Sequence, residues 1–340
     1  MSRITLSKSA FFDNLTLLSR KLGGPEKLAI VLKDNAYGHG LMQMAELSRD
    51  FGLTRAVVRT FAEAEAIRDL FDHILILNPQ PPYIDDPRYA LTINDLAQLD
   101  RLPPHTAVEL KVDTGMHRNG IHREDLKRAF LLVSERSLRL RGVMTHFRSA
   151  DELGATLFWQ MRQWRSIKEE VTTLCKECDM PLPHFHSANS AATLRLKHYE
   201  DDFARCGIAA YGYHEMHPAF GVYPLRPVMR LYADKITTLK LQKGERIGYG
   251  GCFRADREMV VSTYDIGYGD GFLRYDGSGE MVINGRKILG KISMDSFSAE
   301  GAEEAIALIG DAKEIAHRFG TISYDILVKL NPAIPRTIVD

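Results

Sequence analysis

The chain has 340 residues, 45% of them hydrophobic and 26% charged, which is typical of a globular protein with two domains or with a barrel and an addition. Its 44 Lys and Arg residues balance its 44 Asp and Glu residues, which argues against a nucleic-acid or anionic-membrane partner and favours a small-molecule ligand. The N-terminal MSRITLSKSA lacks the apolar stretch of a signal peptide, and no segment has the roughly 18 apolar residues of a membrane span. We therefore expect a cytoplasmic protein.

Residues 28 to 210 alternate short apolar runs with amphipathic helical patterns. Eight runs predict strands: LAIVLK, RAVVRTF, HILILNP, YALTIN, AVELKVD, LRLRGVMTHF, PHFHSA and FARCGIAAYG. The stretches between them, such as GLMQMAELSRDFG and FWQMRQWRSIKEEVTTLCKE, predict helices. Alternating strands and helices imply a parallel sheet, and eight repeats favour closure into a (β/α)8 TIM-type barrel. We assign this α/β barrel to residues 1–218.

The pattern then changes to short strands separated by Gly-rich and Asp-rich turns, which predicts a mainly β C-terminal domain over residues 219–340. Its expected strands include VMRLYADKITTLKL, MVVSTYDIGY, GEMVING and RKILGKISM, and DAKEIAHRFG is an expected helix. The strand-like RITLS at the start of the chain is a candidate to pair with this second domain.

Polar residues follow several of the predicted barrel strands. In a barrel the active site lies at the C-terminal ends of the strands, so these residues are expected to converge on one mouth. They are Lys33 in AIVLKDNAYGHG, residues 111–118 in KVDTGMHR, His146 in THF, residues 186–190 in HSANS and residues 205–208 in RCGI.

Two of these segments suit a phosphate. SANSAAT and CGIAAYG offer a hydroxyl, small residues and backbone amides after the seventh and eighth strands, where barrels often bind phosphate groups; each alone also fits a helix cap or a tight turn. A lysine, an imidazole and an arginine beside a phosphate site indicate pyridoxal phosphate held as a Schiff base. Zinc at Cys175, Cys178, His184 and His186 is a weaker alternative, because a second tight pair is missing and the cysteines lie in a helical pattern.

Nine segments, in order along nearly the whole chain, make the sequence resemble alanine racemase, a barrel-type pyridoxal-phosphate enzyme. They are AIVLKDNAYGHG, KVDTGMHRNG, MTHFRSAD, HSANSAA, RCGIAAYG, IGYGGCFRAD, DIGYGDGF, GKISMD and ISYDILVKLNPAIPR. The resemblance implies that Lys33 holds the cofactor and moves the α-proton on one face of the substrate. It makes Tyr249 the base on the other face, contributed by the partner subunit of a head-to-tail homodimer.

The resemblance assigns roles to further residues. Those matched to cofactor binding, besides Lys33, are Tyr37, His146, Asn189, Ser190, Arg205, Gly207, Ile208 and Tyr324. Those matched to substrate binding are Arg118, the Met294 amide and Tyr268, with His186, Lys111 and Asp295 in supporting positions. In many relatives the lysine that matches Lys111 is carbamylated and orients the carboxylate-binding arginine. Asp34 and Cys206 replace residues that are usually Ala and Pro in the family, and neither change removes a catalytic atom.

Racemisation requires a proton to leave one face of the α-carbon and another to arrive at the opposite face, so two bases must flank the substrate. Lys33 and Tyr249 meet this need, although their side chains have solution pKa values of about 10 and must be tuned downward. Arg205 stays protonated, so it would discourage protonation of the pyridine ring, weaken the electron sink and favour racemisation over side reactions.

The resulting prediction is an alanine racemase that supplies D-alanine for peptidoglycan. A racemase of serine or of broader specificity would use the same two bases, and only the size of the substrate pocket distinguishes these activities. Decarboxylases of similar architecture carry a different C-terminal motif from IGYGG. A pyridoxal-phosphate-binding protein without catalytic function would be a lone barrel, whereas here the second domain carries Tyr249, Met294 and Tyr324.

Overall fold

The computed structural model describes all residues from Met1 to Asp340. The chain forms two compact units. The barrel unit contains Phe12–Ala36 and Met44–Arg226, and the β unit contains Met1–Phe11, Tyr37–Gln43 and Pro227–Asp340. Because the β unit takes in two short segments from the N-terminal part of the chain, neither unit is continuous in sequence.

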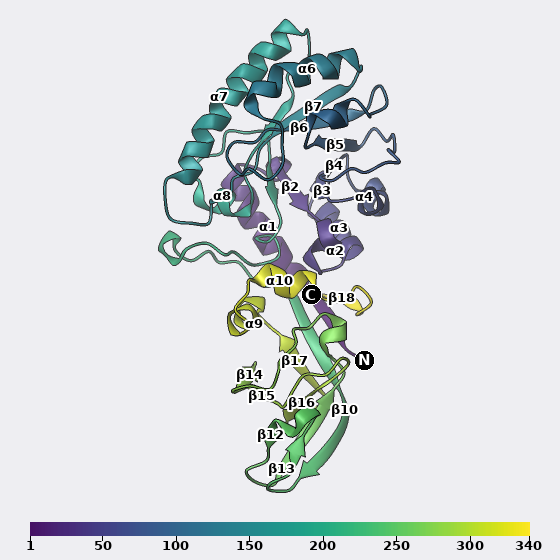
Figure 1. Cartoon of the computed structure of the whole chain (residues 1–340), viewed down its shortest axis with the longest axis vertical. Coiled ribbons are helices and arrows are strands. Elements are labelled where there is room, and N and C mark those ends of the chain that lie inside the picture. The colour runs from purple at the N-terminus through teal and green to yellow at the C-terminus, as the bar shows by residue number, and fades with distance from the viewer. The chain divides into compact units, whose positions relative to one another are not determined.

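Eight parallel strands form the sheet of the barrel unit (Figure 1). They are β2 (Leu28–Val31), β3 (Arg55–Val58), β4 (His73–Ile76), β5 (Tyr89–Ile93), β6 (Ala107–Lys111), β7 (Arg139–Met144), β8 (His184–His186) and β9 (Ala204–Cys206). From β2 to β8 each strand pairs with the next along the chain, and β9 pairs with β2. The ladder is open between β8 and β9, where the Asp202 and Arg205 amides donate to the carbonyls of Phe185 and Ala188 at 2.9 and 3.0 Å. The predicted α/β barrel is confirmed.

Helices alternate with these strands. They are α1 (Lys8–Leu22), α2 (Lys33–Tyr37), α3 (Leu41–Asp50), α4 (Phe61–Ile67), α5 (Leu96–Leu99), α6 (Leu126–Glu135), α7 (Thr156–Glu177) and α8 (Ser190–Arg195). Short 3-10 turns lie at η1 (Pro25–Lys27), η2 (Arg68–Leu70), η3 (Arg123–Asp125) and η4 (Pro218–Phe220). Strands β4, β5 and β6 are buried along their whole length, as expected for a parallel sheet covered by helices. This explains why their sequences are almost continuously apolar.

The long strand β10 (Met229–Leu241) organises the β unit. It pairs antiparallel with β1 (Arg3–Ser7), β13 (Met259–Tyr264) and β17 (Ala305–Ile309), and β1 pairs in parallel with β18 (Arg336–Val339). The other elements are β11 (Arg246–Ile247), β12 (Phe253–Arg254), β14 (Met281–Ile283), β15 (Arg286–Leu289), β16 (Phe297–Glu300), α9 (Ala312–Arg318) and α10 (Ser323–Val328). RITLS at the start of the chain therefore lies between two strands of the C-terminal region.

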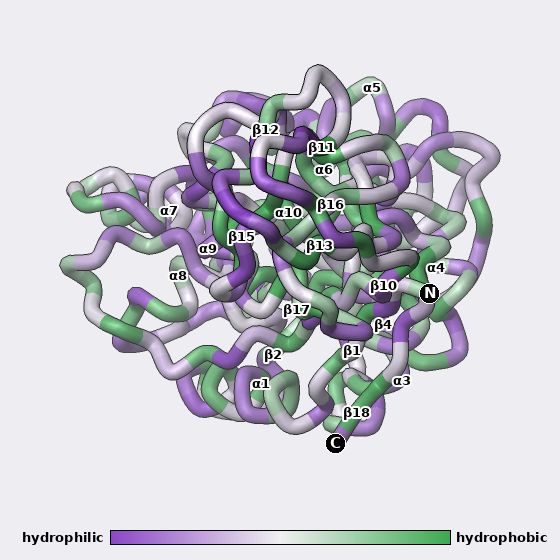
Figure 2. The backbone as a smooth tube through the Cα atoms, turned by 90° about the horizontal axis from the view of Figure 1, so that it is seen from below, coloured by the Kyte–Doolittle hydropathy of each residue, from purple (hydrophilic) through white to green (hydrophobic).

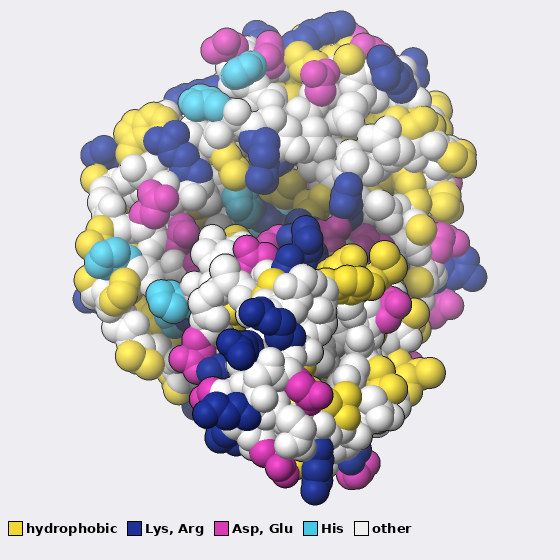
Figure 3. Space-filling model, turned by 60° about the horizontal axis from the view of Figure 1, so that its bottom comes forward, with side chains coloured by type: hydrophobic (Ala, Val, Ile, Leu, Met, Phe, Trp, Pro, Cys, Tyr) yellow, Lys and Arg dark blue, Asp and Glu magenta, His cyan; other side chains and the backbone are white.

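The surface is polar and of mixed charge. In the face shown in Figure 3, basic and acidic side chains are interspersed, in keeping with the equal numbers of the two kinds in the sequence. Strand β15, which lies between β14 and β16, begins with Arg286 and Lys287 and is hydrophilic in Figure 2. None of the helices has the length and apolar character needed to span a bilayer.

Candidate active site

Lys33 follows β2 and opens an unusual turn. The next residues, Asp34, Asn35 and Ala36, have left-handed backbone angles with φ of 54°, 55° and 52°, and Tyr37 continues with φ 52°. Non-glycine residues in this region cost about 1–2 kcal/mol each, so the surrounding structure must hold the turn in place. Glu63 does so in part, because its Oε1 accepts the Asp34 amide proton at 2.7 Å. The Gly, Asn and His residues after Lys33 indicate a turn, but they do not indicate left-handed angles at four consecutive non-glycine residues.

The Lys33 side chain lies in a charged setting and is 34% exposed. Its Nζ is 3.5 Å from Asp34 Oδ2, and Asp34 Oδ1 is 3.1 Å from the guanidinium of Arg59. Asp34 is thus shared between two cations. This residue departs from the family pattern, and the structure gives it a contact with Lys33.

Arg205, at the centre of β9, is buried and held by four hydrogen bonds. Its Nη1 donates to His186 Nδ1 at 2.5 Å and to the His186 carbonyl at 3.0 Å. Its Nη2 donates to the carbonyls of Thr145 and Ser187 at 2.6 and 3.2 Å. The expected support of Arg205 by His186 is therefore present in the structure. The guanidinium is fixed at the C-terminal ends of β7, β8 and β9.

His146 marks where the predicted cationic residues come together. Burial and the nearby positive charges of Arg205, Lys111, Arg118 and Lys33 lower the pKa of His146 to about 3. An imidazole with this pKa is neutral at physiological pH. Each of these four cations contributes to the lowered pKa of His146.

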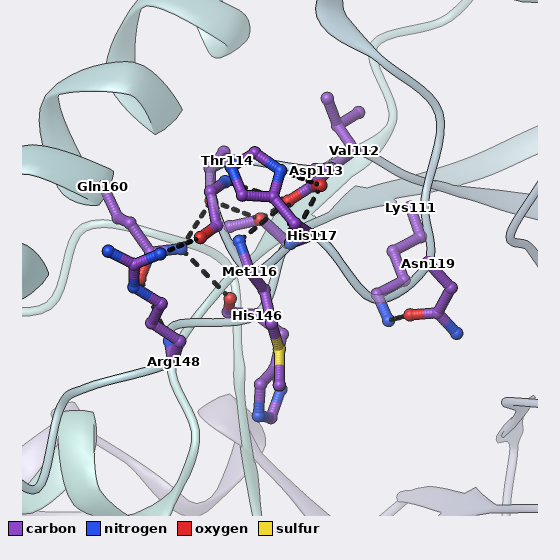
Figure 4. Close-up of polar contacts among 12 residues, drawn as sticks. Lys111, Val112, Asp113, Thr114, Met116, His117, Asn119, His146, Arg148 and Gln160 are labelled. Carbon is purple, nitrogen blue, oxygen red and sulfur yellow. Dashed lines mark hydrogen bonds and ion pairs between the residues drawn. The ribbon is translucent and has the colours of Figure 1, made fainter.

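Lys111 ends β6 and is buried, and its Nζ donates to Asn119 Oδ1 (Figure 4). Burial and the positive charges of Arg118 and Arg205 lower its pKa to about 8. The Arg118 side chain itself is exposed.

A buried amide ties the loop after β6 to the segment after β7 (Figure 4). Gln160 of α7 donates to Thr114 Oγ1 at 3.1 Å and to the His146 carbonyl at 3.3 Å, and its Oε1 accepts the Arg148 amide proton at 3.0 Å. Within the loop, Asp113 accepts the amide protons of residues 115–117. Sequence reasoning missed Gln160, because nothing in an amphipathic helix distinguishes this glutamine from a surface one.

The predicted phosphate segments meet at Ser190. Its hydroxyl oxygen accepts the amide protons of Gly207 at 3.1 Å and of Ala209 at 3.3 Å, on either side of buried Ile208. Asn189 has a structural role, because its Oδ1 caps α8 by accepting the Ala192 amide proton at 2.9 Å. Asn189 therefore acts as a helix cap. The Ser190 hydroxyl and the backbone amides of Gly207 and Ala209 lie together.

The zinc alternative does not account for His186. Both of its ring nitrogens have partners, Arg205 at Nδ1 and Glu109 at Nε2. Cys175 is buried in α7, and burial raises the pKa of its thiol, which opposes the thiolate form that zinc requires.

In the β unit, Tyr249 lies at the tip of the β11–β12 hairpin and is 74% exposed. Gly248 and Gly250 flank it with φ of 67° and 71°, angles that glycine adopts without strain. Ile247 and Phe253, the strand pair next to the loop, pack on an apolar cluster that includes Leu289. The packed strands of the hairpin thus hold Tyr249 in an exposed position.

The other expected residues of the β unit form two groups. Tyr268 and Met294 lie on adjoining backbone, since the Gly269 amide donates to the Met294 carbonyl at 2.8 Å and the Tyr268 amide to that of Ser293 at 3.1 Å. Asp295 follows Met294 and is exposed. The rings of Tyr37 and Tyr324 lie 5.8 Å apart, which brings these two predicted phosphate ligands together.

Comparison with known proteins gives a consistent result. Residues 6–215 match the family model described as alanine racemase, N-terminal domain, and residues 228–338 match that of the alanine racemase C-terminal domain. The chain is 48% identical to an alanine racemase of Nitratiruptor sp. and 44% identical to one of Campylobacter curvus, in each case over 100% of both chains. A structure of alanine racemase from Bacillus anthracis with bound L-Ala-P superposes with a TM-score of 0.87 at 29% identity, covering 100% of this chain and 95% of the other.

Proposed function

The chain belongs to the alanine racemase family, and from that premise we propose that it interconverts L-alanine and D-alanine with Lys33 and Tyr249 as the two bases. The alanine racemase activity rests on full-length identity to relatives of that name. The residue assignment rests above all on one observation, the buried guanidinium of Arg205 held by His186, Thr145 and Ser187 at the C-terminal ends of the barrel strands.

The barrel unit has side chains that fit pyridoxal phosphate. Ser190 and the amides of Gly207 and Ala209 converge and suit a phosphate, while the fixed guanidinium of Arg205 suits an unprotonated ring nitrogen that accepts a hydrogen bond. When bound, pyridoxal phosphate acidifies the α-proton of an attached amino acid by withdrawing electrons. Lys33 is the amine available at the end of β2 to hold it. His146, kept neutral, would pack beside the ring without adding charge.

The remaining steps concern protons and position. The Lys33 amine would take or return the α-proton on one face, and the Tyr249 hydroxyl would do so on the other. Arg118 would hold the substrate carboxylate as a charge-assisted pair, together with the Met294 amide. D-Alanine made in this way would supply peptidoglycan synthesis.

The homodimer is part of this proposal. Tyr249, the proposed base, is 74% exposed at the hairpin tip, so its own hairpin does not shield it from water. Met294 is 56% exposed as well. A second copy of the chain that covers Tyr249 and Met294 would supply both the desolvation and the opposite face of the site.

The proposed function is tested by exchange of the α-proton in heavy water. The protein with pyridoxal phosphate is given L-alanine, L-serine and larger L-amino acids one at a time, and the product is resolved by chiral chromatography. We expect fast exchange with inversion of alanine. Inversion mainly of serine would keep the two bases and change the substrate, whereas bound cofactor with no exchange for any amino acid would leave a binding protein.

Lys111 is proposed to be carbamylated, since only a neutral amine reacts with carbon dioxide. With the pKa of Lys111 lowered to about 8, half of its amines are neutral near that pH, against less than about 1% for an ordinary lysine. At constant dissolved carbon dioxide we therefore expect carbamate on Lys111 to increase from about pH 7 to about pH 9. The measurement is a ¹³C NMR spectrum with labelled bicarbonate.

The carbamate signal should disappear in Lys111→Gln and persist in Lys329→Gln, which removes a surface lysine paired with Asp325. A signal that survives Lys111→Gln would show that another amine is modified.

A further inference from the structure

We propose that Glu109, in the interior of the barrel, is a positioning residue that holds the Nε2 proton of His186 and balances the charge of Arg205. The proposal about structure stands on the contacts of these residues, and its consequence for catalysis rests on the proposed function. Glu109 was not among the residues singled out from the sequence. The available signal was a carboxylate inside AVELK, a strand that is buried at every position.

The hydrogen-bond donors determine the tautomer. The Arg205 guanidinium can only donate, so His186 Nδ1 must accept in their 2.5 Å contact and carries no proton. In the neutral imidazole the proton then lies on Nε2, which donates to Glu109 Oε2 at 2.7 Å. The other carboxylate oxygen, Oε1, is 2.9 Å from Nε2 of His73 on β4. A continuous chain of contacts thus runs from β4 through β6 and β8 to β9.

The buried positive charge of Arg205 requires a compensating carboxylate nearby. Glu109 and His186 are fully buried and Arg205 is 6% exposed, so the arginine charge is far from water. Burial raises the pKa of Glu109, but contacts with His186 and His73 outweigh it and hold the pKa below its usual range. Burial also lowers the pKa of His186 to about 4, which keeps the imidazole neutral. Glu109 is therefore the anion that offsets Arg205 across a neutral histidine.

Packing fixes this arrangement. A Cβ at Gly142 of β7 would lie 2.8 Å from Glu109 Cδ, so the glycine makes room for the carboxylate. The His186 ring stacks on Phe203 with centroids 4.2 Å apart and an angle of 21° between the planes. Arg141, beside Gly142, is a further positive charge that acts on Glu109. The space left by Gly142 and the stack on Phe203 thus support the placement of Glu109 and His186.

The first test reads the tautomer directly in the holoenzyme, by ¹⁵N NMR of histidine-labelled protein with the His186 signals assigned through His186→Asn. We expect an Nε2-protonated, neutral His186 that does not titrate between about pH 6 and about pH 9. An Nδ1-protonated or doubly protonated ring at pH 8 would overturn the proposal without the use of any Glu109 variant.

The second test separates acceptor from charge. Glu109→Gln keeps an acceptor for His186 and removes the charge, whereas Glu109→Leu removes both. For Glu109→Leu we expect the Nε2–H resonance of His186 to shift upfield, because its proton loses the acceptor. We also expect kcat to fall about 10- to 100-fold, the range for partners that orient a functional histidine, with KM for alanine little changed. Glu109→Gln should keep the tautomer and lose less of kcat. Glu170→Gln, which removes a carboxylate paired with Arg123 on the surface, is the matched control.

Gly142→Ala serves if Glu109→Leu does not fold, because it displaces the carboxylate without changing any ionisable group. It should perturb the His186 signals and lower kcat. Unchanged His186 signals and kcat in Glu109→Leu, or in Gly142→Ala in its place, would refute the proposal. A wild-type protein that racemises no amino acid would refute the proposed function instead. The NMR experiment would still test the contact between Glu109 and His186.

Discussion

Lys33→Ala and Tyr249→Phe are each expected to lower racemase activity by about 10²- to 10⁴-fold, because each removes a group that transfers a proton. If Tyr249 acts in the partner's site, a hybrid dimer of one Lys33→Ala chain and one Tyr249→Phe chain contains one intact site and one site with both defects. Such hybrids, isolated with two different affinity tags, should regain about half of the wild-type activity. The measurement is the initial rate of D-alanine formation per dimer.

The control is a hybrid of Lys33→Ala with Arg205→Glu. Both substitutions lie in the barrel unit, so every site of this hybrid keeps a defect and activity should stay low. Lack of recovery in the Lys33→Ala and Tyr249→Phe hybrid would place the tyrosine in the site of its own chain and remove the shared-site dimer from the proposal.

Arg205→Glu is expected to change which reaction occurs as well as how fast. The substitution exchanges a fixed donor for a group that can share a proton with the pyridine nitrogen, so the ring becomes a stronger electron sink. Racemisation should fall by about 10²- to 10³-fold, as for loss of a preorganised donor, and the keto acid formed per racemisation should rise. Chiral chromatography and a keto-acid assay on the same sample give both quantities.

Arg205→Lys separates charge from geometry in this experiment. It keeps the positive charge but cannot reach the carbonyls of Thr145, His186 and Ser187 together, so racemisation should fall while the keto-acid fraction stays low. Thermal unfolding of both variants checks that the barrel still forms. If Arg205→Glu leaves the keto-acid fraction unchanged, the guanidinium does not control reaction specificity.

Much of the fold could be predicted because its physical signals are local. The barrel strands are buried on both sides, so LAIVLK, HILILNP and AVELKVD stand out as apolar runs, and all eight predicted runs contain a strand. Polar residues at strand ends predicted the site for the same reason, since the barrel brings those ends together. The resemblance to alanine racemases was carried by nine motifs, and the full-length relatives confirm it.

The parts that were missed depend on contacts between distant residues. Glu109 and His73 are 36 positions apart and meet only because β4 and β6 face one interior. The left-handed angles of Asp34–Tyr37 run against local preference and are supported by Glu63, so residue propensities do not indicate them. Ile322 to Leu330 was left without a predicted element, although Ser323–Val328 is helical.

The pairing of β1 bears on how the protein folds during synthesis. Arg3–Ser7 leaves the ribosome well before its partners β10 and β18, which begin at residues 229 and 336. At ordinary translation rates the first strand therefore waits on the order of tens of seconds before both edges are covered. During that time it is an unpaired apolar edge, so nascent chains should depend on chaperones that shield their N-terminus. A ribosome stalled before β18 would carry a chain whose two ends have not yet met.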